Sequence, residues 1–339
     1  MRVLDLDYPL PPELIAQEPA PSREAARLLV VDRSAGTLRH GQVRNLGDHL
    51  TPGDLLVLND TRVISARLRG RRPTGGQLEV LLVRPLDGQV WDAIVRGQPR
   101  VGEQVSFAEG QGTWEASRGG GRWWVRLEVP GPVDEWLARV GELPLPPYIQ
   151  RPNGPTVADL DRYQTVFAAA PGAIAAPTAG LHLTLPLLAQ LAGRGIETAT
   201  LTLHVGPGTF LPIRDGDLAH YTMEPERSVV TDETVARIHR TRARGGRVIA
   251  VGTTTVRALE SAAESGDLLP HAGEAALFIK PGHRFRAVDG LLTNFHLPRT
   301  PLLALVAAFA DWPTLRTAYE TAVAERYRFY SYGDAMLIV

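Results

Sequence analysis

Apolar and polar positions divide the chain into segments with different periodicities. Residues 55–60, L-L-V-L-N-D, form a continuous apolar run with a polar end, which is typical of a strand buried on both faces. From about 63 to 150, short alternating runs such as Q-L-E-V-L-L-V and R-W-W-V-R-L-E-V are separated by glycine-rich turns. Strands of this length and spacing predict a small barrel or sandwich, and P-L-P-P-Y-I-Q-R (144–151) is expected to form a rigid linker that leaves it.

Beyond residue 151 the periodicity alternates between helix and strand. The pattern predicts helices at about 186–194, 232–244, 254–265 and 300–310. It predicts strands at 27–31, at 196–205, at R-V-I-A-V-G-T-T-T and at L-F-I-K (277–280). This alternation indicates an α/β fold in which helices cover a mostly parallel sheet.

Composition narrows the chemistry. A chain of 339 residues lies near two average domains, and 44% hydrophobic residues with a net charge of -1 are typical of a soluble globular protein. The absence of cysteine excludes disulfides, thiolate nucleophiles and cysteine metal sites. The N-terminus has no apolar run of the kind found in signal peptides, and no apolar stretch is long enough to span a membrane, so we expect a cytoplasmic location.

Four polar motifs fall at predicted strand or helix ends, where α/β sheets bind ligands. They are A-P-T-A-G-L-H (176–182), T-L-H-V-G-P-G-T-F (202–210), V-G-T-T-T-V-R (251–257) and L-T-N-F-H-L-P (292–298). Each also has a purely structural interpretation: glycines that form a tight turn, threonines that cap a helix, and histidines with structural hydrogen bonds. Neither a dinucleotide fingerprint nor a P-loop is present, and the spacing of the histidines predicts no metal site.

The C-terminal segment is rich in aromatic residues. Tyr327, Phe329, Tyr330 and Tyr332 lie beside Arg326 and Arg328. These side chains could stack on nucleic-acid bases, or they could belong to an aromatic closing strand in the core. The sequence leaves both interpretations open.

The motifs together resemble the S-adenosylmethionine:tRNA ribosyltransferase-isomerase family of queuosine biosynthesis. The resemblance runs over nearly the whole chain, from L-P-P-E-L-I-A-Q and P-G-D-L-L-V-L-N-D-T-R-V-I, through the four motifs above, to Y-R-F-Y-S-Y-G-D-A-M-L-I. It implies transfer and isomerisation of the ribosyl part of S-adenosylmethionine, as co-substrate, onto 7-aminomethyl-7-deazaguanine at the wobble position of tRNA. The products would be epoxyqueuosine, adenine and methionine, with no metal required.

The resemblance also implies a domain arrangement. Residues 1–62 and 151–339 would form a larger, discontinuous α/β catalytic domain, and residues 63–150 a smaller inserted β-barrel. This agrees with the change of pattern near 63 and 150.

The chemistry requires proton transfer and a site for each substrate, and we assign candidates accordingly. His204 or His182 would handle protons, because imidazole titrates nearest to neutral pH. Asp60, beside Arg62, is a second candidate for proton transfer. His296 would contact the adenine or the deazaguanine base. The expected substrate-binding residues are Thr178, Gly180, Gly206, Gly208, Thr209, Gly252, Thr253, Thr254, Arg257, Asn294, Tyr332 and Asp334.

The sequence departs from the family pattern at three positions. Glu224 stands where a histidine is expected, Ser65 where proline is expected, and Pro207 where a small residue is expected. For tRNA we expect a patch formed by Arg67, Arg69, Arg71, Arg72, Arg326 and Arg328. Without the resemblance, the same histidines would fit a lyase or hydrolase that cleaves S-adenosylmethionine, and the barrel would fit a nucleic-acid-binding module without catalysis.

Overall fold

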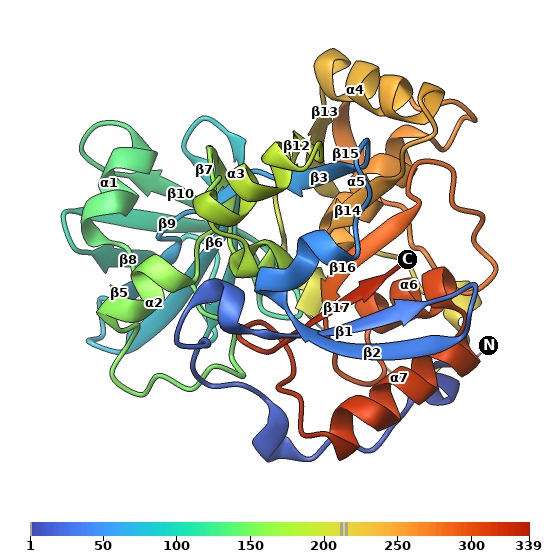
Figure 1. Cartoon of the computed structure of the whole chain (residues 1–339). Coiled ribbons are helices and arrows are strands. Elements are labelled where there is room, and N and C mark those ends of the chain that lie inside the picture. The colour runs from blue at the N-terminus through green and yellow to red at the C-terminus, as the bar shows by residue number, and fades with distance from the viewer. Residues whose placement is uncertain (1, 211–212, 214–215) are drawn as a thin grey trace.

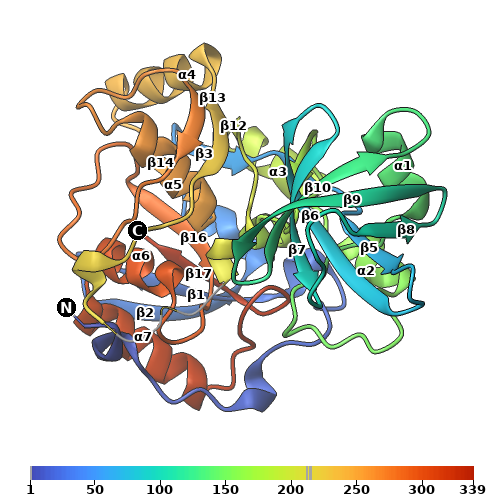
Figure 2. The ribbon, with the colours of Figure 1, turned by 180° about the vertical axis from the view of Figure 1, so that it is seen from behind.

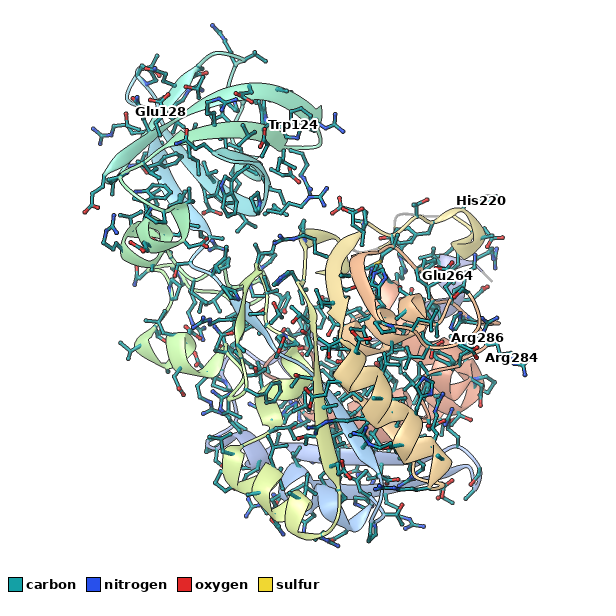
Figure 3. All side chains as sticks on the ribbon, turned by 90° about the horizontal axis from the view of Figure 1, so that it is seen from above. Trp124, Glu128, His220, Glu264, Arg284 and Arg286 are labelled. Carbon is teal, nitrogen blue, oxygen red and sulfur yellow. The ribbon has the colours of Figure 1, made fainter. Side chains whose placement is uncertain are left out.

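A large sheet covered by helices and a separate closed barrel make up the protein. The computed structural model describes residues 2–210, 213 and 216–339. In Figure 1 the barrel lies to one side of the sheet, and the view from behind in Figure 2 shows the same separation. Figure 3 shows the barrel, which carries Trp124 and Glu128, standing beside the sheet and its helices, which we call the body.

Nine strands form the sheet in the body, in the order β15-β13-β12-β3-β14-β16-β17-β1-β2. Its centre is parallel, so the carboxyl ends of these strands meet at one edge. The central strands are β12 (Glu197–Leu203), β3 (Leu55–Asn59), β14 (Val248–Val251) and β16 (Gly290–Asn294).

The flanks make the sheet mixed, with four parallel and four antiparallel pairs, rather than mostly parallel. The expected strand at 277–280 is wrong: Leu277, Phe278 and Ile279 follow the edge strand β15 and pack in or against the core without pairing. The flanking strands are β13 (Glu226–Val230), β15 (His271–Ala275), β17 (Ala335–Ile338), β1 (Arg27–Asp32) and β2 (Thr37–Gln42).

Helices cover both faces of the sheet because consecutive residues of its central strands are apolar and point alternately to the two faces. Leu55 and Val57 of β3 belong to a core with α4, α5, α6 and α7, whereas Leu56 and Leu58 belong to a core with α3. Side-chain caps fix several helix starts, as where the Thr184 hydroxyl accepts the Leu187 N–H. The helices are α3 (Leu185–Gly193), α4 (Asp232–Ala243), α5 (Thr253–Ala262), α6 (Pro301–Ala310) and α7 (Trp312–Ala324).

The second part is a closed barrel with strand order β10-β7-β6-β5-β8-β9. Val80, Val105, Trp114 and Val125 fill its interior, and Trp136 of α1 (Val133–Val140) packs against the same core. The predicted barrel is therefore confirmed, while the boundaries at 63 and 150 stay a prediction. Its strands are β5 (Arg67–Arg71), β6 (Gln77–Asp87), β7 (Val90–Arg96), β8 (Gln104–Phe107), β9 (Gly110–Gly119) and β10 (Arg122–Glu128).

Short elements connect these parts. The paired strands β4 and β11 lie where the chain passes between the body and the barrel. No helix within the described ranges is long and apolar enough to cross a membrane. The short elements are η1 (Val3–Leu6), η2 (Pro12–Leu14), η3 (Arg23–Ala25), η4 (Val43–Asp48), β4 (Thr61–Val63), α2 (Val157–Arg162), β11 (Ala170–Ala173), η5 (Thr178–His182), η6 (Pro207–Phe210) and η7 (Leu218–His220).

The C-terminal aromatic residues are part of the core. Tyr327 and Phe329 are fully buried and pack against Phe295. Tyr330 and Tyr332 are also buried, which excludes the interpretation that these four rings form an exposed stacking surface. The aromatic residues belong to the core, as one interpretation held, but they do not form the closing strand. That strand begins after them, at Ala335.

Candidate active site

Two adjacent pockets lie near the carboxyl ends of the central strands. The first, which we call the central pocket, lies within the body. It contains six of the residues expected to bind substrates or take part in catalysis. Its lining is Ala176, Pro177, Thr178, Ala179, Val205, Gly252, Thr253, Thr254, Thr293, Asn294, His296, Leu302, Tyr330 and Ser331.

The start of α5 forms one wall of the central pocket. Gly252 precedes the helix with φ of +93°, a conformation that side chains rarely adopt, so glycine is required there. The Thr254 hydroxyl accepts a hydrogen bond of 3.2 Å from the Asn59 amide at the end of β3. Thr255 turns its hydroxyl back to the Val251 carbonyl at 2.8 Å and is structural. The first N–H groups of α5 therefore face a pocket at the positive end of the helix dipole.

Asn294 connects two of the motifs. The Thr178 hydroxyl donates to Asn294 Oδ1 at 2.9 Å, and Asn294 Nδ2 lies 3.1 Å from His182 Nε2. His182 is buried behind Asn294 and does not line the central pocket. Burial, together with nearby Arg328, lowers the pKa of His182 to about 4, so its imidazole is neutral at pH 7. This places His182 as a support for Asn294.

His296 is a neutral imidazole in the lining of the central pocket. Its Nε2 lies 2.8 Å from the Thr293 hydroxyl, and its backbone N–H donates to the Tyr319 hydroxyl at 2.9 Å. Burial lowers the pKa of His296 to about 3. A neutral ring fixed in this way can donate or accept one hydrogen bond but carries no charge.

The second pocket lies between the body and the barrel, and we call it the barrel-side pocket. It shares Val205 with the central pocket, so the two are neighbours along the end of β12. Its lining is Val83, Arg84, Arg122, Gly172, His204, Val205, Gly206, Pro207, Gly208, Glu224, Pro225, Glu226 and Arg227.

His204 is the histidine of the barrel-side pocket. Its Nδ1 lies 2.8 Å from the Thr61 hydroxyl, which fixes the ring and leaves Nε2 as the other ring nitrogen. Gly172 lies against the ring, and a Cβ at that position would come within 2.9 Å of His204 Cε1. Burial, with a smaller effect from Arg227, lowers the pKa of His204 to about 4. The imidazole is therefore neutral at pH 7 and able to accept a proton.

A buried ion pair holds the glycine turn that follows His204. Arg257 Nη1 donates to Glu226 Oε2, and the Gly206 N–H donates to Glu226 Oε1 at 2.6 Å. Arg257 Nη2 also donates to the Ala275 carbonyl at 3.1 Å. Arg257 lies behind this carboxylate and lines neither pocket, so it supports the turn instead of facing a ligand.

Comparison with known proteins identifies the family. A family model described as "Queuosine biosynthesis protein" matches residues 3–338. The chain belongs to this family. The resemblance drawn from the motifs is thereby confirmed.

Relatives over the full length support the same assignment. S-adenosylmethionine:tRNA ribosyltransferase-isomerase from Citrifermentans bemidjiense is 50% identical over 342 residues and covers 100% of both chains. The protein of that name from Anaeromyxobacter sp. is 52% identical over 344 residues and covers 100% of this chain and 99% of the relative. The crystal structure of S-adenosylmethionine tRNA ribosyltransferase from Thermotoga maritima is 36% identical, with a TM-score of 0.58 over 99% of this chain and 100% of that one.

Several expected residues of this queuosine biosynthesis protein lie outside both pockets. Asp60 accepts from the Thr202 hydroxyl at 2.6 Å, and burial raises its pKa. Arg62 is exposed, and no ion pair joins it to Asp60 within the described part of the chain. Gly180 packs under the Phe167 ring, where a Cβ would come within 2.8 Å. The Thr209 side chain lies outside the described residues.

Tyr332 and Asp334 also lie outside both pockets, unlike Asn294 and His296. The Tyr332 hydroxyl donates to Asp159 at 2.9 Å. The Asp334 carboxylate accepts the backbone N–H groups of Arg27 and Arg328 at 2.9 and 2.8 Å. Both side chains fix the C-terminal segment, because their polar atoms are committed to the protein itself.

Sequence reasoning missed several lining residues. Tyr330 and Ser331 line the central pocket although they belong to the buried aromatic segment. Arg84 and Arg122 reach the barrel-side pocket from β6 and β10 of the barrel. Nothing in the alternating barrel strands distinguishes these two arginines from other solvated positions. Ser331, by contrast, lies within a quoted family motif.

The expected arginine patch on the barrel is largely committed to internal contacts. Arg69 pairs with Glu142 at 2.8 Å, and Arg72 pairs with Glu103. Arg67 donates to the Leu145 carbonyl at 2.7 Å. Arg71 is exposed and joins no ion pair among the residues that the structure describes. These four residues therefore do not form the free cationic patch that we expected.

No group of three or more His, Asp or Glu side chains in residues 2–210, 213 and 216–339 could hold a metal ion. The expectation that the reaction needs no metal stays a prediction.

Proposed function

We propose that the protein transfers and isomerises the ribosyl part of S-adenosylmethionine onto 7-aminomethyl-7-deazaguanine at the wobble position of tRNA. The observation that carries this proposal is the pair of pockets that meet at Val205, one within the body and one facing the barrel. The reaction joins part of a small molecule to a polynucleotide. It therefore needs a site for the small molecule and, next to it, a site that a tRNA base can enter. Adenine leaves first, the tRNA amine then attacks, and methionine leaves as the epoxide closes.

The central pocket suits S-adenosylmethionine. Its Gly252 allows close approach of the backbone, and the N–H groups at the start of α5 favour a carboxylate such as that of methionine. Asn294 offers amide atoms suited to the edge of an adenine ring. The site has no carboxylate among its lining residues, which fits a ligand whose own carboxylate must be bound.

The barrel-side pocket suits the tRNA base. It lies between body and barrel, and its lining includes the positive charges of Arg84, Arg122 and Arg227. Cations near the mouth of a base site bind the phosphates that flank the base. A base that leaves its stack can enter such a pocket while the rest of the anticodon stays outside.

The position of His204 supports a role in proton transfer between these two sites. The sulfonium acidifies the adjacent ribose carbon, and a neutral base must take the proton from it. His204 is neutral at pH 7, is oriented by Thr61, and precedes the shared Val205 by one residue. We assign it as the base, with His182 supporting Asn294.

One assay tests the whole proposal. Purified protein is incubated with S-adenosylmethionine and tRNA that carries 7-aminomethyl-7-deazaguanine, and adenine release and the mass of the tRNA are measured. Adenine release matched by the ribosyl mass gain supports the proposal. Adenine release that does not need tRNA would instead identify an enzyme that cleaves S-adenosylmethionine. Tight tRNA binding without product would leave a binding module.

A further inference from the structure

Glu224 is the weakly held carboxylate of the barrel-side pocket. Its side chain is 50% exposed, and its contact with Arg122 Nη1 is long, at 3.3 and 3.5 Å to the two carboxylate oxygens. Arg122 is itself fixed by Asp92 of the barrel, which binds Nε at 3.2 Å and also binds Nη2. Removing Glu224 from Arg122 would therefore leave the guanidinium paired.

The other carboxylate of the pocket is committed. Glu226 is 5% exposed, receives the Gly206 N–H, and pairs with the buried Arg257. It cannot turn toward a ligand without uncovering a buried arginine, which is costly. Of the two carboxylates among the described lining residues, only Glu224 is available.

The turn after His204 is shaped around Glu224. A Cβ on Gly208 would lie 3.2 Å from Glu224 Cβ and 3.3 Å from Glu224 Oε2. The second glycine of the T-L-H-V-G-P-G-T-F motif therefore leaves room for this carboxylate beside the pocket. Glu224 thus has a defined place in the wall and a carboxylate open to the pocket.

A carboxylate at this position favours a cationic ligand. The described lining carries three arginines, Arg84, Arg122 and Arg227, which repel a positive charge. A primary amine, like that of lysine with a pKa of ~10.4, is protonated at neutral pH and donates up to about three hydrogen bonds. The aminomethyl group of the deazaguanine is such an amine.

We propose that Glu224 binds the ammonium of the aminomethyl base and so selects modified tRNA over tRNA with guanine at the same position. This inference rests on the proposed function, because it takes the barrel-side pocket as the base site. The ammonium replaces Arg122 as the partner of Glu224, and Asp92 keeps Arg122 in place. The binding step involves no covalent change.

The chain offers a matched control at the same boundary between body and barrel. Glu274 of β15 also has a 50% exposed side chain and also pairs with a barrel arginine, Arg84, at 2.7 Å. Glu274 does not line the barrel-side pocket. Glu224→Gln and Glu274→Gln therefore each remove one ion pair between body and barrel, but only the first removes a carboxylate from the pocket.

The experiment measures equilibrium binding of fluorescent tRNA to full-length protein without S-adenosylmethionine. Three tRNAs are compared, with 7-aminomethyl-7-deazaguanine, the uncharged 7-cyano-7-deazaguanine, or guanine at the wobble position. We expect the unsubstituted protein to prefer the aminomethyl form by about tenfold, the scale of a hydrogen bond to a charged group. Glu224→Gln should lose this preference and bind the two uncharged forms as before, while Glu274→Gln should keep it.

Three results would overturn the inference: no preference in the unsubstituted protein, an unchanged preference in Glu224→Gln, or an equal loss in Glu274→Gln. Matching thermal unfolding curves for the variants exclude misfolding as the cause. The proposed function is judged separately, by adenine release from the unsubstituted protein with aminomethyl tRNA. Active protein with an unchanged preference in Glu224→Gln would refute the inference alone.

Discussion

The Thr61 hydroxyl lies 2.8 Å from His204 Nδ1, and the two residues are 143 positions apart in the chain. Thr61 is fully buried, and its own N–H donates to Asn59 Oδ1 at 3.1 Å. The start of β4 thus orients the histidine that follows β12. Because Thr61 occupies one ring nitrogen, the proposed proton transfer to a ligand would use Nε2.

His204 is expected to be the more important of the two candidate bases. His204→Ala should lower the turnover number for adenine release by about two to four orders of magnitude, the usual range for a general base. His182→Ala should lower it less, because His182 acts through Asn294. The exposed His220 provides the control, since His220→Ala should leave turnover unchanged. Equal losses in the first two variants would contradict the assignment.

Removing the hydroxyl of Thr61 should disturb His204 without removing it. We expect Thr61→Val to lower kcat by about five- to tenfold, the scale of one hydrogen bond, with little change in KM for S-adenosylmethionine. Thr61→Ser keeps the hydroxyl and should restore kcat. The pH profile of kcat checks the interpretation: it should shift in Thr61→Val and return in Thr61→Ser. A stability defect alone would leave the profile in place.

The buried histidines should make the protein less stable in mild acid. The pKa of His296 is about 3 when folded, against ~6.5 in an unfolded chain, so only the unfolded state gains this proton as the pH falls below ~6.5. The free energy of unfolding should fall by up to about 1.4 kcal/mol per pH unit from this residue, down to its folded pKa.

Urea unfolding at several values between about pH 7 and about pH 5 measures this effect. His296→Gln should flatten the dependence by up to one proton, whereas His220→Gln should not change it. The same slope in both variants would show that His296 is not excluded from protonation in the folded protein.

The buried pair of Arg257 and Glu226 should be needed for folding as well as for the turn at Gly206. Arg257→Met leaves a buried carboxylate without its partner and should lower the free energy of unfolding by about 3–5 kcal/mol. The double variant with Arg257→Met and Glu226→Gln should lose clearly less free energy of unfolding than the sum of the two single losses, because neither charge then remains. Denaturant unfolding of the four proteins measures the coupling. Additive costs would mean that the two side chains do not interact.

Gly252 should be needed both for the backbone conformation before α5 and for the shape of the central pocket. Gly252→Ala forces a side chain into φ of +93° and places a Cβ 3.7 Å from Ala179 Cβ. Gly53→Ala meets φ of +97° with no atom within 4 Å, which makes it a control for backbone strain alone. Both should destabilise the fold by about 1–2 kcal/mol. Only Gly252→Ala should also raise KM for S-adenosylmethionine, and equal KM values would remove Gly252 from the substrate site.

Local sequence signals were sufficient for much of the body and for the barrel. Helices such as α4 were predicted within a few residues because their apolar periodicity ends at a glycine, here Gly245, and Thr231 caps the start of α4 in the structure. The apolar run of β3 and the alternating barrel strands carry their own periodicity. The antiparallel flanks were not predicted, because the pairing of β16 with β17 joins distant segments that carry no local mark of orientation.

The sequence by itself determined which motifs lie at strand ends, the absence of thiol chemistry, and a resemblance long enough to indicate the family. Only the tertiary structure decided which side chains of those motifs face a pocket. Asn294 and His296 do, while Asp334, from an equally recognisable motif, caps backbone N–H groups. It also brought Arg122 of the barrel to Glu224, 102 residues away. The reason is physical: a side chain's partner is set by contacts between segments far apart in the chain, and local periodicity contains no record of them.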